Sequence, residues 1–194
     1  MSKFLKIVIT SPNAVADETS KVCRLLEANA CDLLHLRKPQ WSRAETTSFL
    51  RALPQELLGR IRLHDHFELC DLFPVGGVQL NARNSIAPAS ARSYSRSCHT
   101  LDEIEHEKGA EYVTLSPIFD SISKTGYCRG DWDGDRLHSL LKERVVIALG
   151  GIEPSHFRYL QDKGFSGAAL LGYVWNNPEG KSFDRIVTTL KDFQ

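Results

Sequence analysis

The chain has 194 residues, and its 24 lysine and arginine residues balance its 24 aspartate and glutamate residues. This length predicts one domain that can bury a full core. The balanced charge gives no reason to expect a nucleic acid or an anionic membrane surface as a partner. No run approaches the roughly 18 apolar residues of a membrane span, and the N-terminal run is too short for a signal peptide. Five cysteines without a CxxC pair fit a reducing compartment, so we expect a cytoplasmic protein.

Short segments rich in Val, Ile and Leu alternate along the chain with longer segments of helical period. The predicted strands are Phe4–Thr10, Asp32–Arg37, Arg60–His64, Gly77–Asn81, Ser93–Ser97, Glu111–Ser116, Arg144–Gly150 and Ser166–Gly172. Helix starts are indicated by the capping-box pairs Ser42/Glu45 and Thr100/Glu103, by Asp131 as a cap and by Pro154 in a first turn. Eight such units predict an α/β fold, a closed (β/α)8 TIM barrel over residues 1–194, with an open doubly wound sheet as the alternative. Strands three, four and five start so close together that their helices must be minimal.

Side chains alternate within five successive strands, and one face of each is polar. The polar positions are His35 and Arg37; Arg62 and His64; Gln79 and Asn81; Ser93, Ser95 and Ser97; and Thr114 and Ser116. In a barrel the apolar faces pack against helices, so these polar faces are expected to point inward near the C-terminal rim. The alternative is a sheet with one wet face, which the intervening helices argue against.

Glycines end the last two predicted strands, at Gly150 and Gly151 and, after Leu171, at Gly172. Glycine lets backbone N–H groups approach an anion closely, and barrels often bind phosphate after strands seven and eight. A phosphate site is therefore predicted there. The alternative is that these glycines only cap tight turns.

Charged residues also follow strands on the other side of the predicted mouth. Arg37 and Lys38 follow strand two, Asp65 follows strand three, and Lys124 lies in the long polar loop after strand six. A diphosphate would need an arginine, a mobile lysine and Mg²⁺ held by carboxylates. We therefore expect a polyanionic ligand at this mouth.

The segments LHLRKP, LHDH, GGVQLNARN, GAEYVTLSPIFDSISKTG, ALGGI and GFSGAALLG resemble thiamine phosphate synthase and its TenI-type relatives. The resemblance covers nearly the whole chain and implies a (β/α)8 barrel. It implies a transferase of thiamine biosynthesis that joins hydroxymethylpyrimidine diphosphate to thiazole phosphate and releases pyrophosphate. The most specific segment is the loop LSPIFDSISKTG, in which Ser116 replaces a glycine of the family.

The resemblance also assigns roles to residues. It implies that Lys124 contacts pyrophosphate and that Ser97 stabilises the leaving group, so both are predicted to be catalytic. The positions that match the family are Arg37, Asp65, Gly150 and Gly151, and Lys38 lies beside Arg37. Two positions differ from the family: His35 replaces a pyrimidine-contacting glutamine, and His64 replaces an asparagine. The predicted Mg²⁺ ligands are Asp65 and Asn84, and Asn84 stands where the family has a second aspartate.

Other activities stay open. A TenI-like thiazole tautomerase could use His35 or His64 as an acid–base group, although Pro117 stands where those proteins carry a histidine. A third possible function is non-catalytic binding of a phosphorylated thiamine precursor. The protein could form a homo-oligomer with any of these functions. His64, Asp65 and His66 could suggest zinc, but their spacing is poor for it. Cys98 is either a reactive thiol or, as we expect, a buried inert one.

Overall fold

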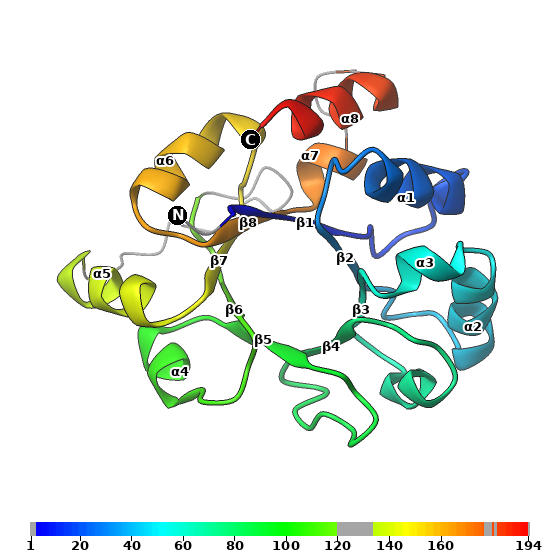
Figure 1. The fold of residues 1–194 in the computed structure, drawn as a ribbon, viewed down its shortest axis with the longest axis horizontal. Coiled ribbons are helices and arrows are strands. Elements are labelled where there is room, and N and C mark those ends of the chain that lie inside the picture. The colour runs from blue at the N-terminus through cyan, green and yellow to red at the C-terminus, as the bar shows by residue number, and fades with distance from the viewer. Residues whose placement is uncertain (1–2, 120–133, 177–179, 181, 194) are drawn as a thin grey trace.

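The computed structural model describes residues 3–119, 134–176, 180 and 182–193. Eight parallel strands pair in sequence order and close into a barrel (Figure 1). They are β1 (Leu5–Ile9), β2 (Leu33–Leu36), β3 (Ile61–Leu63), β4 (Gly77–Leu80), β5 (Tyr94–Cys98), β6 (Val113–Leu115), β7 (Val146–Leu149) and β8 (Gly167–Leu170). Each predicted strand overlaps an observed one, so the predicted barrel is confirmed and the open sheet is wrong.

Helices surround the barrel (Figure 1). They are α1 (Glu18–Glu27), α2 (Arg43–Arg51), α3 (Gln55–Leu58), α4 (Leu101–His106), α5 (Gly134–Glu143), α6 (Phe157–Asp162), α7 (Gly172–Trp175) and α8 (Phe183–Asp192), with 3₁₀ turns η1 (Phe67–Asp71) and η2 (Pro154–His156). Both predicted capping boxes are present. The Ser42 and Thr100 hydroxyls accept the backbone N–H groups of Glu45 and Glu103, and the two glutamate side chains accept the backbone N–H groups of Ser42 and Thr100. Pro154 begins η2 as predicted. The predicted cap Asp131 lies outside the described residues.

The outer layer is thinnest between β3 and β5. Only η1 separates β3 from β4, and residues 81–93, between β4 and β5, contain no helix. The expectation of minimal helices is confirmed for the first crossover. For the second it is wrong, because an irregular loop replaces the helix.

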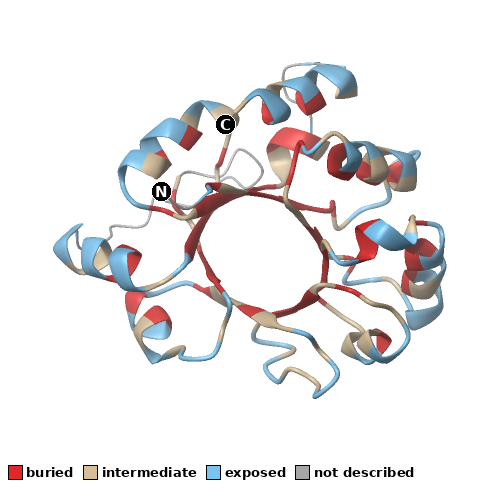
Figure 2. Cartoon of the chain, in the orientation of Figure 1, coloured by how far each residue is buried: buried red, intermediate tan, exposed pale blue. Residues whose placement is uncertain are grey.

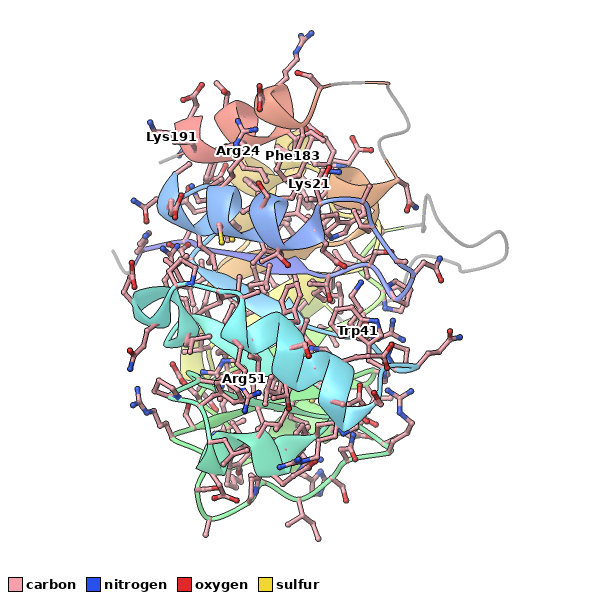
Figure 3. All side chains as sticks on the ribbon, turned by 90° about the vertical axis from the view of Figure 1, so that its right-hand side faces the viewer. Lys21, Arg24, Trp41, Arg51, Phe183 and Lys191 are labelled. Atoms are coloured by element: carbon pink, nitrogen blue, oxygen red, sulfur yellow. The ribbon has the colours of Figure 1, made fainter. Side chains whose placement is uncertain are left out.

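The last helix closes the ring beside the first. Arg24 of α1 forms an ion pair with Asp184 of α8, and the Lys21 Nζ lies 5.8 Å from the centre of the Phe183 ring (Figure 3). These contacts attach the C-terminal end of the chain to its start.

The barrel interior has a polar half and an apolar half. His35 on β2 contacts Tyr112, just before β6, with Nε2 2.6 Å from the phenol oxygen. Since β2 and β6 are not neighbouring strands, this contact can only cross the interior, which confirms that the polar faces point inward. The other half is an apolar cluster around Ile7, Ile9 and Ile147. Figure 2 shows buried strands inside helices whose outer faces are exposed.

Candidate functional site

A cavity of about 710 Å³ opens at the carboxyl ends of the strands. Its lining residues are Ile9, Arg37, His64, Asn81, Ala82, Arg83, Ser85, Arg96, Ser97, His99, Glu103, His106, Glu107, Leu149 and Leu171. Four predicted site residues are therefore brought together here: Arg37, His64, Ser97 and Leu171. The carboxyl end is also the face on which barrel enzymes carry their active sites.

Arg37 is held at the cavity through its backbone. Its N–H donates to the Thr10 hydroxyl at 2.8 Å, and that hydroxyl donates to the Arg37 carbonyl at 3.2 Å. Burial, followed by the nearby positive charge of Arg83, lowers the pKa of the Arg37 guanidinium, and Asp65 opposes this. Two guanidinium groups thus share one wall of the cavity, which favours an anionic ligand.

Arg83, which the sequence analysis did not select, is placed by the loop after β4. The Asn81 side-chain oxygen accepts the backbone N–H groups of Arg83 and Asn84 at 2.9 and 3.1 Å. Asparagine commonly orders a turn in this way. Arg83 and Arg96, which also lines the cavity, could have been selected as basic residues on or directly after a strand.

The two predicted metal ligands lie side by side next to the cavity. The Asn84 Nδ2 donates to Asp65 Oδ1 at 3.1 Å and to the His64 carbonyl at 3.0 Å, and the Arg83 guanidinium lies 3.6 Å from Asp65 Oδ1. Asp65 Oδ2 is buried and has no hydrogen-bond partner among the described residues. This oxygen fits Mg²⁺, which prefers oxygen ligands and often uses only one or two carboxylates beside phosphate and water. Asn84 could reach the ion only through its side-chain oxygen.

Ser97 lies on β5 with its oxygen already engaged. Gln79 Nε2 donates to Ser97 Oγ at 3.0 Å, while Gln79 Oε1 accepts from Ser95 at 2.5 Å. Because the Ser97 oxygen accepts from Gln79, the hydroxyl hydrogen is available to a ligand in the cavity. Ser97 is thus arranged as a hydrogen-bond donor.

Two histidines lie one behind the other. His64 lines the cavity, and His35 lies behind it, with its Nδ1 3.0 Å from His64 Nε2. Burial and then the charges of Arg37 and Arg83 lower the pKa of His64 to about 3, and burial lowers that of His35 well below its usual value. Both rings are therefore neutral at physiological pH.

Lys38, predicted to bind substrate, is placed elsewhere. Its side chain is 2% exposed, and its Nζ lies 2.6 Å from Glu18 Oε2 and donates to the Asn13 carbonyl at 2.8 Å. It also lies 4.9 Å from the centre of the Trp41 ring. We correct the prediction because a buried carboxylate already neutralises this charge.

Gly150 and Gly151 follow β7 with φ angles of +94° and +63°, which favour glycine. A Cβ on Gly150 would lie 2.9 Å from Pro117 Cα, so the glycine also admits the loop after β6. Gly172 begins α7 directly after Leu171. These positions are compatible with both a phosphate site and simple turn capping.

The comparisons with known proteins bear on this geometry. The sequence model described as thiamine monophosphate synthase matches residues 6–174. The chain belongs to the thiamine monophosphate synthase family. It is 23% identical over 186 residues to a thiamine-phosphate synthase of Methanococcus maripaludis, covering 88% of this chain and 86% of that protein. A match to the Limosilactobacillus reuteri thiamine-phosphate synthase is 25% identical over 132 residues, 59% of this chain and 58% of that protein.

Solved structures of the thiamine monophosphate synthase family have the same fold. The thiamine phosphate pyrophosphorylase of Bacteroides thetaiotaomicron superposes with a TM-score of 0.79 at 30% identity, covering 98% of this chain and 94% of that one. The thiamine phosphate pyrophosphorylase of Pyrococcus furiosus superposes with a TM-score of 0.70 at 19% identity, covering 97% of this chain and 98% of that one. The family predicted from the motifs is therefore confirmed.

The remaining predictions are settled in part. Lys124 lies outside the described residues, so its role stays a prediction. The described residues contain no group of three or more His, Cys, Asp or Glu side chains that could hold a metal. Cys98 is fully buried, and burial raises its pKa to about 12, as expected of an inert thiol. Within the same residues, every helix is too short or too polar to cross a membrane.

Proposed function

We propose that this member of the thiamine monophosphate synthase family joins hydroxymethylpyrimidine diphosphate to thiazole phosphate and releases pyrophosphate. The observation that carries the proposal is the pairing of Arg37 and Arg83 with the donor Ser97 in one cavity at the barrel mouth. This combination suits a ligand with several negative charges.

The reaction needs no protein nucleophile. The bond between the pyrimidine methylene carbon and the diphosphate oxygen breaks, and its electron pair leaves with pyrophosphate. The thiazole nitrogen then donates its lone pair to that carbon. Arg37 and Arg83 stabilise the negative charge that develops on the leaving group, and Ser97 donates a hydrogen bond to it. Lys124 supplies a further positive charge in this proposal.

Asp65 Oδ2 would hold Mg²⁺, with Asn84 positioning the carboxylate through Oδ1. When bound, Mg²⁺ neutralises negative charge on the diphosphate. The thiazole phosphate is assigned to the opposite rim, near Gly150, Gly151 and Gly172. The positive φ angles of the first two favour glycine, which lets backbone N–H groups approach an anion closely.

The deciding assay supplies both substrates to the purified protein, with Mg²⁺ and with EDTA. Thiamine phosphate formed only with Mg²⁺ supports both the transferase and the metal. Product formed equally with EDTA supports the transferase and contradicts the metal. Thiazole phosphate that binds without any product contradicts the transferase and favours a binding protein.

A second candidate is a tautomerase acting on a thiazole phosphate alone. The observation that favours it is the neutral imidazole of His64 in the cavity wall, which could exchange a proton with a ligand. Interconversion of thiazole phosphate isomers without the pyrimidine substrate, abolished by His64→Gln, would support it.

We also infer a cytoplasmic location. It is supported by the free state of Cys23, Cys31, Cys70 and Cys98, the cysteines that the structure describes. Fractionation of cells would test it.

A further inference from the structure

One side of the barrel has no α-helix in its outer layer and presents apolar side chains instead. Residues 67–76, which begin with η1, and the loop of residues 81–93 follow each other along the outside of β3, β4 and β5 (Figure 1). Among the described residues, the large apolar side chains with the greatest exposure are Ile86 at 82% and Leu72 at 57%, one on each segment. Partly buried apolar side chains of the same two segments are Phe67, Cys70, Phe73, Ala87 and Ala91. We call these seven residues the thin face.

The thin face differs from the helical sides of the barrel. A single exposed apolar residue is ordinary on a protein surface. Outer helices such as α2 direct charged residues toward solvent, as Arg43 and Arg51 show. Two adjacent segments that both expose apolar side chains are instead typical of an interaction surface.

The charges of these two segments complement those of a second copy of the chain. Residues 67–93 contain two acids, Glu68 and Asp71, both on η1, and two arginines, Arg83 and Arg92, both in the loop. Glu68 and Arg83 have ion-pair partners within the chain. The exposed side chains of Asp71 and Arg92 form no hydrogen bond or ion pair among the described residues. A two-fold axis can pair these two charges, because each copy then offers its acid to the arginine of the other.

Few hydrogen bonds within the chain hold the outer part of the loop. The Ala91 N–H donates to the Pro88 carbonyl at 3.0 Å, and among the described residues no other backbone–backbone hydrogen bond involves residues 85–92. Arg83 and Ser85, from the start of the same loop, line the cavity. A second copy packed on the loop would therefore also hold one wall of the cavity.

We propose that the thin face is the interface of a two-fold symmetric homodimer. The apolar residues of the two copies pack on each other, and Asp71 of each copy pairs with Arg92 of the other. A second copy fits better than an unrelated protein because the same two segments supply the apolar surface and both unpaired charges. Association also holds the loop that carries Arg83, so it strengthens anion binding in the cavity; this last part rests on the proposed function.

Sedimentation of the full chain over a range of concentrations tests the dimer. We expect a dimer, and Ile86→Glu should raise its dissociation constant about 30-fold or more, because it places a charge in an apolar interface. Val145→Glu is the matched control, since Val145 is also exposed but lies directly before β7. A monomer at every concentration would overturn the proposal and leave the face to a different partner. A dimer that Ile86→Glu does not weaken would also overturn it, because the contact would lie on another face.

Charge reversal tests the two-fold pairing. Asp71→Arg and Arg92→Asp should each raise the dissociation constant about tenfold, because each creates two like-charge contacts per dimer. The two changes together should restore association. Both side chains lack a partner within the chain, so each variant is expected to keep the circular dichroism spectrum of the unaltered protein. A double variant as weak as the single ones would contradict the pairing.

The link to the cavity is tested with inorganic pyrophosphate. Calorimetry at a concentration where Ile86→Glu is monomeric and the unaltered protein is dimeric should show affinity lowered about threefold or more in the variant. Equal affinity would refute the link between association and the cavity wall. Sedimentation needs no ligand, so a failed synthase assay and a failed dimer are separate results.

Discussion

Replacing Lys38 by methionine tests whether this lysine stabilises the fold or binds substrate. Methionine keeps an aliphatic stem that can pack on Trp41 but removes the charge that faces Glu18. The lysine and glutamate side chains are only 2% and 7% exposed, and their charged atoms lie 2.6 Å apart. Removing the lysine leaves a buried carboxylate without its cation.

The structure gives the size of the effect. Breaking a buried ion pair by removing one partner costs about 3–5 kcal/mol. Glu18 begins α1, where the helix dipole favours a carboxylate by about 0.3–1 kcal/mol at an exposed site and by about 2 kcal/mol at most where it is partly buried, so the dipole cannot replace the lysine. Glu18 Oε1 has no partner among the described residues even with Lys38 present. We therefore expect the free energy of unfolding to fall by about 3–5 kcal/mol at pH 7, lowering Tm by about 10 °C.

The effect should depend on pH in a defined direction. Burial raises the pKa of Glu18, and Lys38 opposes this, so the pKa rises further once the lysine is gone. A carboxyl whose folded pKa lies above its unfolded value destabilises the fold at high pH. That cost disappears as the pH falls through the folded pKa and toward the unfolded one. The penalty of Lys38→Met relative to the unaltered protein should therefore be smaller near pH 5 than at pH 7.

The assay is denaturant unfolding at both pH values, together with steady-state kinetics. Adding Glu18→Gln to Lys38→Met should restore most of the lost stability, because the pair then contains no buried charge. KM for the pyrimidine diphosphate should stay within about twofold. A stable variant whose KM rises strongly would refute the reasoning and return Lys38 to the substrate site.

Three further substitutions test the proposed binding of the diphosphate and the packing of the loop after β7. Arg83→Ala should raise KM for the pyrimidine diphosphate about tenfold or more, whereas Arg51→Ala, at the far end of α2 (Figure 3), should not; equal KM values would exclude Arg83 from binding. Lys124→Ala should lower kcat about 100-fold with Tm unchanged, and Lys142→Ala should change neither; parallel losses of kcat and Tm would make Lys124 structural. Gly150→Ala should lower the free energy of unfolding by at least about 1–2 kcal/mol, because its φ is +94° and the new Cβ would meet Pro117; a neutral effect in denaturant unfolding would contradict this geometry.

The barrel could be predicted from the sequence because its signals are local. Alternation within five of the strands and caps such as Ser42 and Thr100 specify an element from neighbouring residues alone. The one exception lies between β4 and β5, where the residue count predicted a minimal helix and the structure has an irregular loop. Such a count limits the length of a crossover but not its conformation.

The site was harder to predict because its contacts are not local. Lys38 and Arg37 are consecutive in sequence, yet one binds a buried glutamate and the other lines the cavity. The alternation of side chains along a strand could assign Arg37 and Lys38 to opposite faces. The contact between Glu18 and Lys38, however, depends on the packing of α1 against β2. Arg83 differs from these, because the local turn made by Asn81 places it, and a basic residue shortly after a strand was a usable signal.

The polar half of the interior explains why these residue types occur together. A buried polar group must be hydrogen-bonded, so the two nitrogens of His35, which lies inside the barrel, require two partners. His64 and Tyr112 meet this need from the two sides of the ring. Gln79 likewise joins Ser95 to Ser97. Each of these two series of hydrogen-bonded side chains ends at a residue that lines the cavity, His64 or Ser97. The hydrogen bonds that pair the buried polar groups therefore also decide which atom a ligand meets in the cavity.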